Sequence, residues 1–284
     1  MSDYLLLAIN GLLMVLMPLI VATFLARRYG VGWGLFGAGA TTFVASQILH
    51  IPFNAFVEAR FLPDVTGDFS IQLVLVALFY GLSAGVFEEV ARYVTFRYWR
   101  RDARSWAQSL MVGAGHGGIE SLIVGLLFIV NTVVVMGIGR GNFTALVPAD
   151  ALPQLQAQAA TILALPWYEK ILGGVERVFT IVVHLALSLM VMRSARSSTP
   201  WWLLLAIAWH TLLNAAAVVT VVMTNAVITE LVIGVFALIS LWLIYRWREQ
   251  PVAVTEIDSE APERPLPPLE IEASAQELDE SRFL

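Results

Sequence analysis

The chain has 284 residues, of which 58% are hydrophobic and only 14% charged, a formal net charge of −5 and no cysteine. Soluble globular proteins carry roughly 25% charged residues, so this composition excludes a water-soluble enzyme, a nucleic-acid-binding protein with a basic face, and a disordered chain. It indicates a multi-pass membrane protein whose surroundings are the lipid bilayer. The lack of cysteine excludes disulfides, thiolate metal sites, a cysteine nucleophile and lipidation on cysteine.

Seven segments are apolar enough to span a bilayer, which takes about 20 residues of helix. They are residues 4–26, 33–53, 70–95, 106–138, 168–192, 201–222 and 226–246. We therefore predict an all-α transmembrane bundle of about seven spans over residues 1–248, with a motif-bearing core at 70–222.

Two segments are not predicted to span. Residues 139–167 form a long connection with a moderately amphipathic middle, and we expect a helix lying in the membrane interface. Residues 249–284 are acidic and rich in proline, so we expect a disordered cytoplasmic tail with little surface to bury.

The basic residues of the short loops predict the orientation. Ten of them follow the odd-numbered spans: Arg27, Arg28, Arg97, Arg100, Arg101, Arg104, Arg193, Arg196, Arg246 and Arg248. The opposite loops have only Arg60, Arg140 and Lys170. Because cytoplasmic loops carry the excess of Lys and Arg, we predict an external N-terminus and a cytoplasmic C-terminus.

Several polar side chains fall inside the predicted spans, where they cost several kcal/mol each and usually mark a function or a pairing partner. They are Glu88, Glu89 and Arg92 in span three, His116 and Glu120 in span four, Glu176, Arg177 and His184 in span five, and His210 and Asn214 in span six.

Four of these residues lie at nearly the same depth. Glu89, His116, His184 and His210 are eight to eleven residues from the basic ends of their spans, which is about 12 to 16 Å at 1.5 Å per residue. We therefore expect one buried site that opens toward the cytoplasmic half of the bilayer. His50, close to the external end of span two, is expected to be interfacial and structural.

The spacing within helices predicts further pairs. Arg92 lies one turn after both Glu88 and Glu89 and can pair with either acid. Glu120 and Arg177 should lie at similar depth and form an ion pair between spans four and five, while Glu176 and Arg177 remain candidates for both a structural and a site role. The glycines at 113, 115, 117 and 118 predict a bend or a close helix crossing.

Two kinds of chemistry use these side chains. In hydrolysis, a carboxylate beside a histidine takes a proton from water, while a second histidine and an amide stabilise the oxyanion. Alternatively, neutral imidazoles and a carboxylate bind zinc, which lowers the pKa of bound water toward about 7. The spacing alone leaves both open.

The segments FEEVARY, GAGHGGIE, GGVERVFTIVVHLALS and WHTLLN, in this order and spacing, resemble the YhfC family of bacterial intramembrane metalloproteases. More distantly, they are similar to the CAAX prenyl protease and bacteriocin-processing superfamily of membrane endopeptidases. The resemblance covers roughly residues 70–220. It implies a protease of the bacterial cytoplasmic membrane that acts on a membrane protein or peptide.

The resemblance also implies roles for individual residues. Glu88 or Glu89 would be the catalytic carboxylate, and His116 would help it to activate water. His210 and Asn214 would polarise the scissile carbonyl or stabilise the oxyanion. Arg92 follows the glutamate pair one residue earlier than in the wider superfamily, which leaves both glutamates as candidates.

We therefore predict an intramembrane endopeptidase with about one zinc ion bound by His116, His184 and His210, and with Glu88 or Glu89 as fourth ligand or base. The supporting residues are Arg92, Glu120, Glu176 and Arg177. The alternatives are a proton-coupled transporter or channel that uses the same Glu and His cluster, and a scaffold in which the polar groups only fix helix packing.

Overall fold

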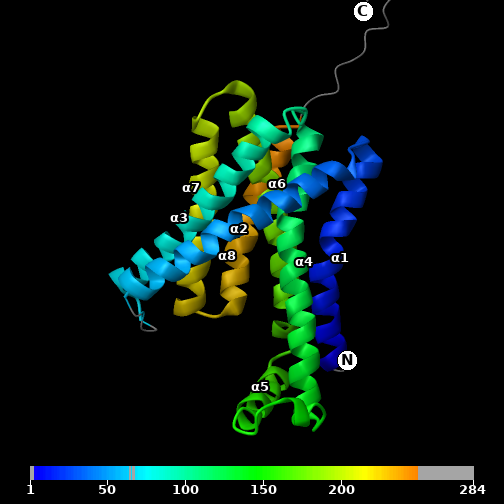
Figure 1. Cartoon of the computed structure of the whole chain (residues 1–284), viewed down its shortest axis with the longest axis vertical. Coiled ribbons are helices and arrows are strands. Elements are labelled where there is room, and N and C mark those ends of the chain that lie inside the picture. The colour runs from blue at the N-terminus through cyan, green and yellow to red at the C-terminus, as the bar shows by residue number, and fades with distance from the viewer. Residues whose placement is uncertain (1–2, 64, 66–67, 249–284) are drawn as a thin grey trace, which may run out of the picture. The chain divides into compact units, whose positions relative to one another are not determined.

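The computed structural model describes residues 3–63, 65 and 68–248, and over these residues it is helical with no strand. The long helices are α1 (Asp3–Tyr29), α2 (Trp33–Phe61), α3 (Ile71–Val94), α4 (Trp106–Gly139), α6 (Leu172–Ser197), α7 (Trp201–Met223) and α8 (Ala226–Arg246) (Figure 1). All seven are long and apolar enough to cross a membrane, which confirms the predicted all-α bundle. The predicted tail at 249–284 lies outside the described residues.

The second span is longer than predicted. We expected it to end at residue 53, but α2 continues to Phe61 with Pro52 inside it. Proline removes one backbone hydrogen bond from a helix, and here the apolar chain beyond it still continues as a helix. His50 consequently lies in the interior of α2, more than two turns from its end.

Shorter helices occupy the connections. A π-helical segment, η1 (Thr95–Trp99), extends α3, and the connection after α4 holds η2 (Thr144–Leu146), α5 (Leu152–Ala164) and η3 (Glu169–Ile171). The predicted helix in this connection is therefore present as α5. Its placement in the membrane interface stays a prediction.

The two ends of the bundle differ in charge. Arg27 and Arg28 lie at the end of α1, Arg100 follows η1, and Arg196 and Arg246 lie in the last turns of α6 and α8. We call this the basic end; it is at the top of Figure 1, and α5 lies at the opposite end. A capping box at Ser105 begins α4 at the basic end.

Glycines allow the helices that carry the site to approach closely. At the crossing of α2 and α4, a Cβ atom added to Gly39 or Gly115 would overlap the carbonyl oxygen of Val112 or Phe36, respectively. A Cβ on Gly81 of α3 would overlap the carbonyl oxygen of Thr211 in α7. The predicted close crossing of span four is thus confirmed. Small residues at such contacts let backbones pack tightly within a membrane.

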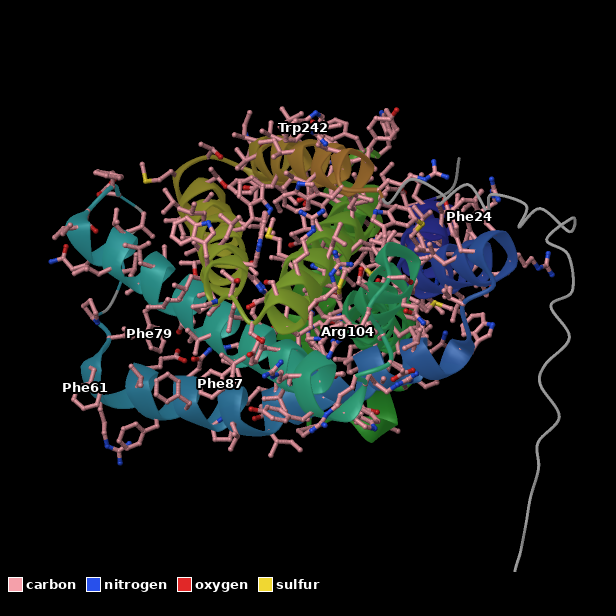
Figure 2. The ribbon with its side chains drawn as sticks, turned by 90° about the horizontal axis from the view of Figure 1, so that it is seen from above. Phe24, Phe61, Phe79, Phe87, Arg104 and Trp242 are labelled. Atoms are coloured by element: carbon pink, nitrogen blue, oxygen red, sulfur yellow. The ribbon has the colours of Figure 1, made fainter. Side chains whose placement is uncertain are left out.

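Apolar side chains cover the outside of the helices. Phe24 of α1, Phe61 of α2 and Trp242 of α8 are 57%, 68% and 60% exposed and point outward (Figure 2). With seven helices of spanning length, this outer surface indicates a multi-pass membrane protein, since a soluble protein rarely exposes so much contiguous apolar surface.

Candidate active site

Four helices bring their intramembrane polar side chains together. The Nε2 atom of His116 on α4 lies 3.1 Å from an Oε2 atom of Glu88 on α3. The ring centroid of His184 on α6 lies 5.3 Å from that of His116 and 5.6 Å from that of His210 on α7. All four side chains are buried. The three predicted histidines therefore converge with the glutamate pair of α3, and their common depth in the membrane stays a prediction.

The two adjacent glutamates have different surroundings. Glu89 is fully buried, forms an ion pair with Arg92, and lies 2.8 Å from Nδ1 of His210 through its Oε1 atom. Glu88 instead lines a cavity, where it contacts His116 through Oε2 and accepts a hydrogen bond of 3.2 Å from Gln47 through Oε1. Of the two acids, only Glu88 faces open space.

His184 is held between an arginine and a carboxylate. Arg92 lies 3.2 Å from Nδ1 of this ring through Nη2. A guanidinium can only donate, so Nδ1 accepts. The proton of the neutral ring is then on Nε2, which donates to Oε2 of Glu120 at 2.9 Å. This arrangement fixes both the orientation and the tautomer of His184.

The predicted ion pair between α4 and α6 is present. Nη1 of Arg177 donates to Oε1 of Glu120 at 2.8 Å, and Nη2 pairs with Glu176. Glu120 therefore joins His184 to Arg177, and the polar cluster extends from the histidines along α6 toward the first turn of that helix.

A cavity of about 110 Å³ begins at the histidines. It is lined by Glu88, Glu120, Glu176, Arg177, Thr180, Val183, His184, Leu187, His210, Leu213, Asn214, Ala217 and Ile233. We expected the site to open toward the basic, cytoplasmic end. Most of the lining residues on α6 and α7 instead extend from His184 and His210 away from the basic end, while which end is cytoplasmic stays a prediction.

The second helix contributes a network that the sequence analysis missed. The side-chain oxygen of Gln47 lies 3.2 Å from Nδ1 of His50, and Nδ2 of Asn54 lies 2.9 Å from Nε2 of the same ring. Asn54 can only donate through this nitrogen, so Nε2 accepts and Nδ1–H donates to Gln47, which in turn donates to Glu88. The ring of His50 is buried at 8% exposure in the interior of the bundle, and its expected position at the membrane interface stays a prediction. The spacing of positions 47, 50 and 54 on one helix face was the available signal.

Three donors lie close enough to hold a metal ion. Glu88, His116 and His184 each offer one ligand atom, and these atoms lie within 4.8 Å of one another. The predicted ligands were His116, His184 and His210, with Glu88 or Glu89 as a fourth ligand or base. His210 and Glu89 are instead hydrogen-bonded to each other, and the group of three donors contains Glu88. Two imidazoles and a carboxylate are a ligand set of catalytic zinc sites, so the residues fit such an ion.

Two further contacts bear on metal binding. Nδ1 of His116 is buried and has no hydrogen-bond partner among the described residues. Glu120 behind Nε2 of His184 resembles the carboxylates that orient metal-ligating histidines, which leaves Nδ1 of His184 as the ligand atom. Arg92 would then have to give up its hydrogen bond to Nδ1.

Comparisons with known proteins cover the part of the chain that carries this site. A family model described as "YhfC intramembrane metalloprotease" matches residues 13–236, a range that contains every site residue named above. The chain is also 32% identical over 249 residues to the "Uncharacterized membrane protein YhfC" of Bacillus subtilis (strain 168), which covers 84% of this chain and 94% of that relative. No solved structure matches the chain.

Proposed function

Because the chain belongs to the YhfC intramembrane metalloprotease family, we propose that it is an endopeptidase of the bacterial cytoplasmic membrane. Its substrate is a membrane-embedded or membrane-proximal protein or peptide, in which it hydrolyses a peptide bond. One observation supports this most directly. Glu88 is the cavity-lining carboxylate without an arginine partner, whereas Glu120 and Glu176 both pair with Arg177.

Glu88 is placed to act on water. Its carboxylate faces the cavity beside His116 and is oriented by Gln47 through the other oxygen. A carboxylate held in this way takes a proton from a water molecule that attacks the peptide carbonyl. His116, which is fully buried, fixes the carboxylate in position.

His210 and Asn214 are placed on the substrate side. They are one turn apart on α7, and both line the cavity. Glu89 accepts the Nδ1–H of His210 and stabilises the protonated ring, whose Nε2–H is then available to the carbonyl oxygen. The amide of Asn214 supplies a second donor. Donors aimed at developing negative charge are the largest single contribution in many hydrolytic enzymes.

Glu88, His116 and His184 would hold a metal ion, tentatively zinc, which would supply a Lewis acid that polarises the scissile carbonyl. In a metal-free reaction, Glu88 would act as the base toward water, and His210 and Asn214 would donate hydrogen bonds to the carbonyl oxygen. Activity measured in the presence of a chelator distinguishes the two mechanisms: the metal-dependent reaction stops, and the metal-free reaction continues. Either result is compatible with a peptidase.

The proposal is tested with the purified chain in liposomes, mixed with membranes from cells that lack it. New protein N-termini are identified by mass spectrometry, with the Glu88→Gln variant as the matched control. We expect N-termini within or next to membrane spans that appear with the wild-type chain only. Identical sets of N-termini for both proteins would refute the peptidase function.

A proton-coupled transporter was the main alternative. A proton path requires ionisable groups at every depth of the membrane. Between the site and the basic end, the interior contains Phe96, Met111, Leu189 and Met192, which are at most 1% exposed. The buried polar side chains there, such as Ser109 and Ser188, carry hydroxyls that do not ionise. The distribution of polar groups therefore favours a site that is reached from one end.

A further inference from the structure

We propose that the cavity next to Glu88 is the entrance through which water reaches the site, and that it opens at the end of the bundle opposite the basic end. The accessibility of the cavity is independent of the proposed function. Only its role as the source of the hydrolytic water rests on the peptidase activity.

The cavity has the size and lining that water requires. A buried site holds a water molecule when it offers at least 10–15 Å³ of volume and two to four polar partners. The volume of about 110 Å³ is enough for several molecules, and eight of the thirteen lining side chains are polar.

Most of the lining residues extend away from the basic end. On α6 they run from Leu187 and His184 through Thr180 to Glu176, only four residues after the helix begins at Leu172. On α7 they run from His210 to Ala217, toward the last residue of that helix, Met223. Both helix ends lie opposite the basic end, so the cavity extends away from it.

Charged groups mark the outer part of the cavity. Arg177 lies between Glu120 and Glu176, whose side chains are 26% and 33% exposed, while its own side chain is 10% exposed. Partly exposed carboxylates within a membrane-spanning bundle need hydration. This cluster therefore forms the hydrated outer part of the cavity, whereas the buried side chains between the site and the basic end are apolar or carry uncharged hydroxyls, such as Thr95 and Ser188.

The natural chain has no cysteine, so single cysteines can report water access directly. Thr180→Cys and Ala217→Cys place a thiol on the cavity. Leu212→Cys is the matched control, since Leu212 lies between His210 and Asn214 in sequence but is 53% exposed on the outside of α7, where lipid would cover it. Gln156→Cys on α5 and Ser197→Cys at the basic end report the two sides of the membrane.

A charged, membrane-impermeant methanethiosulfonate reagent is added to intact cells and to inverted vesicles. We expect the cavity thiols to react from the same side as Gln156→Cys, on the order of tenfold faster than Leu212→Cys, because the thiolate that reacts forms only in water. Reaction from the side of Ser197→Cys, or at the rate of Leu212→Cys, would overturn the proposal.

Cleavage of a membrane substrate then tests the role of the water. Modification of Ala217→Cys should lower the cleavage rate by about tenfold or more, and treatment of Leu212→Cys should not change it. Full activity after complete modification would overturn the assignment of this cavity as the water route. Absence of cleavage by the unmodified protein would instead refute the peptidase function, and the labelling pattern would still decide whether the cavity is open to water.

Discussion

A close contact between α4 and His184 of α6 makes a specific prediction for Gly117. A Cβ atom on this residue would lie 2.6 Å from Cδ2 of His184, whereas ordinary contacts begin at 3.4 Å. The imidazole would therefore have to move by about 0.8 Å, away from its hydrogen bonds with Glu120 and Arg92. Since a misplacement of about 1 Å in a catalytic site can cost roughly 100-fold in rate, we expect Gly117→Ala to slow cleavage by about that factor.

The matched control lies on the same helix. A Cβ on Gly125 would lie 2.7 Å from Cβ of Met14 on α1. Gly125→Ala therefore introduces a clash of similar size that involves no residue of the site. Both changes gain roughly 1 kcal/mol of helix propensity, which partly offsets the overpacking. Rates are measured as the appearance of the new N-terminus in liposomes, alongside thermal unfolding. Wild-type cleavage by Gly117→Ala, or equal losses in both variants, would refute the steric argument.

Three further predictions concern the site. Gln47→Leu removes the donor to Oε1 of Glu88, and because a hydrogen bond to a charged group contributes about 1.5–3 kcal/mol, cleavage should slow by roughly 10- to 100-fold with an altered pH–rate profile; an unchanged profile and rate would exclude a positioning role. The purified wild-type chain should hold about one zinc ion by elemental analysis, and His116→Ala should lose it; full activity in a chelator would refute the metal while leaving the peptidase intact. Arg177→Met leaves the Glu120 carboxylate without its cation, so unfolding in detergent should become easier by about 1–3 kcal/mol, less than for a fully buried pair because Glu120 is partly exposed; a midpoint equal to that of the wild type would show that the pair does not stabilise the bundle.

The depth of the site was predictable because ionisable groups are costly in a membrane. Glu89, His116, His184 and His210 stand out against apolar neighbours, and counting residues from the basic ends is enough to place them at one level. The ion pair of Glu120 and Arg177 follows from the same count. No knowledge of side-chain packing is needed for either prediction.

The division of roles between Glu88 and Glu89 was not predictable in this way. Adjacent residues on a helix point about 100° apart. Which of the two glutamates faces the cavity therefore depends on how α3 is rotated about its axis against α7. That rotation follows from close contacts such as Gly81 with Thr211. The direction of the cavity likewise depends on which apolar side chains fill the core.

The role of Gln47 could not be predicted from the sequence for a different reason. Amides and hydroxyls occur in transmembrane helices far more often than charges do, so a single glutamine in an apolar segment gives little signal. Pro52 also hid the position of this glutamine within the bundle, because a proline there suggested that span two ends soon after His50. Only the continuous α2, which runs to Phe61, shows that these side chains face the interior.

The origin of the site residues in four separate helices has a consequence for how the protein is made. Helices enter the membrane in chain order, and His210 and Asn214 belong to α7, the sixth of the seven long helices. A chain that is still being synthesised already contains Glu88, His116 and His184 but lacks the groups that would face the substrate carbonyl. Under the proposed peptidase function, hydrolysis would therefore become possible only late in biogenesis, after α7 has packed against α3, and incomplete chains would not cleave neighbouring membrane proteins.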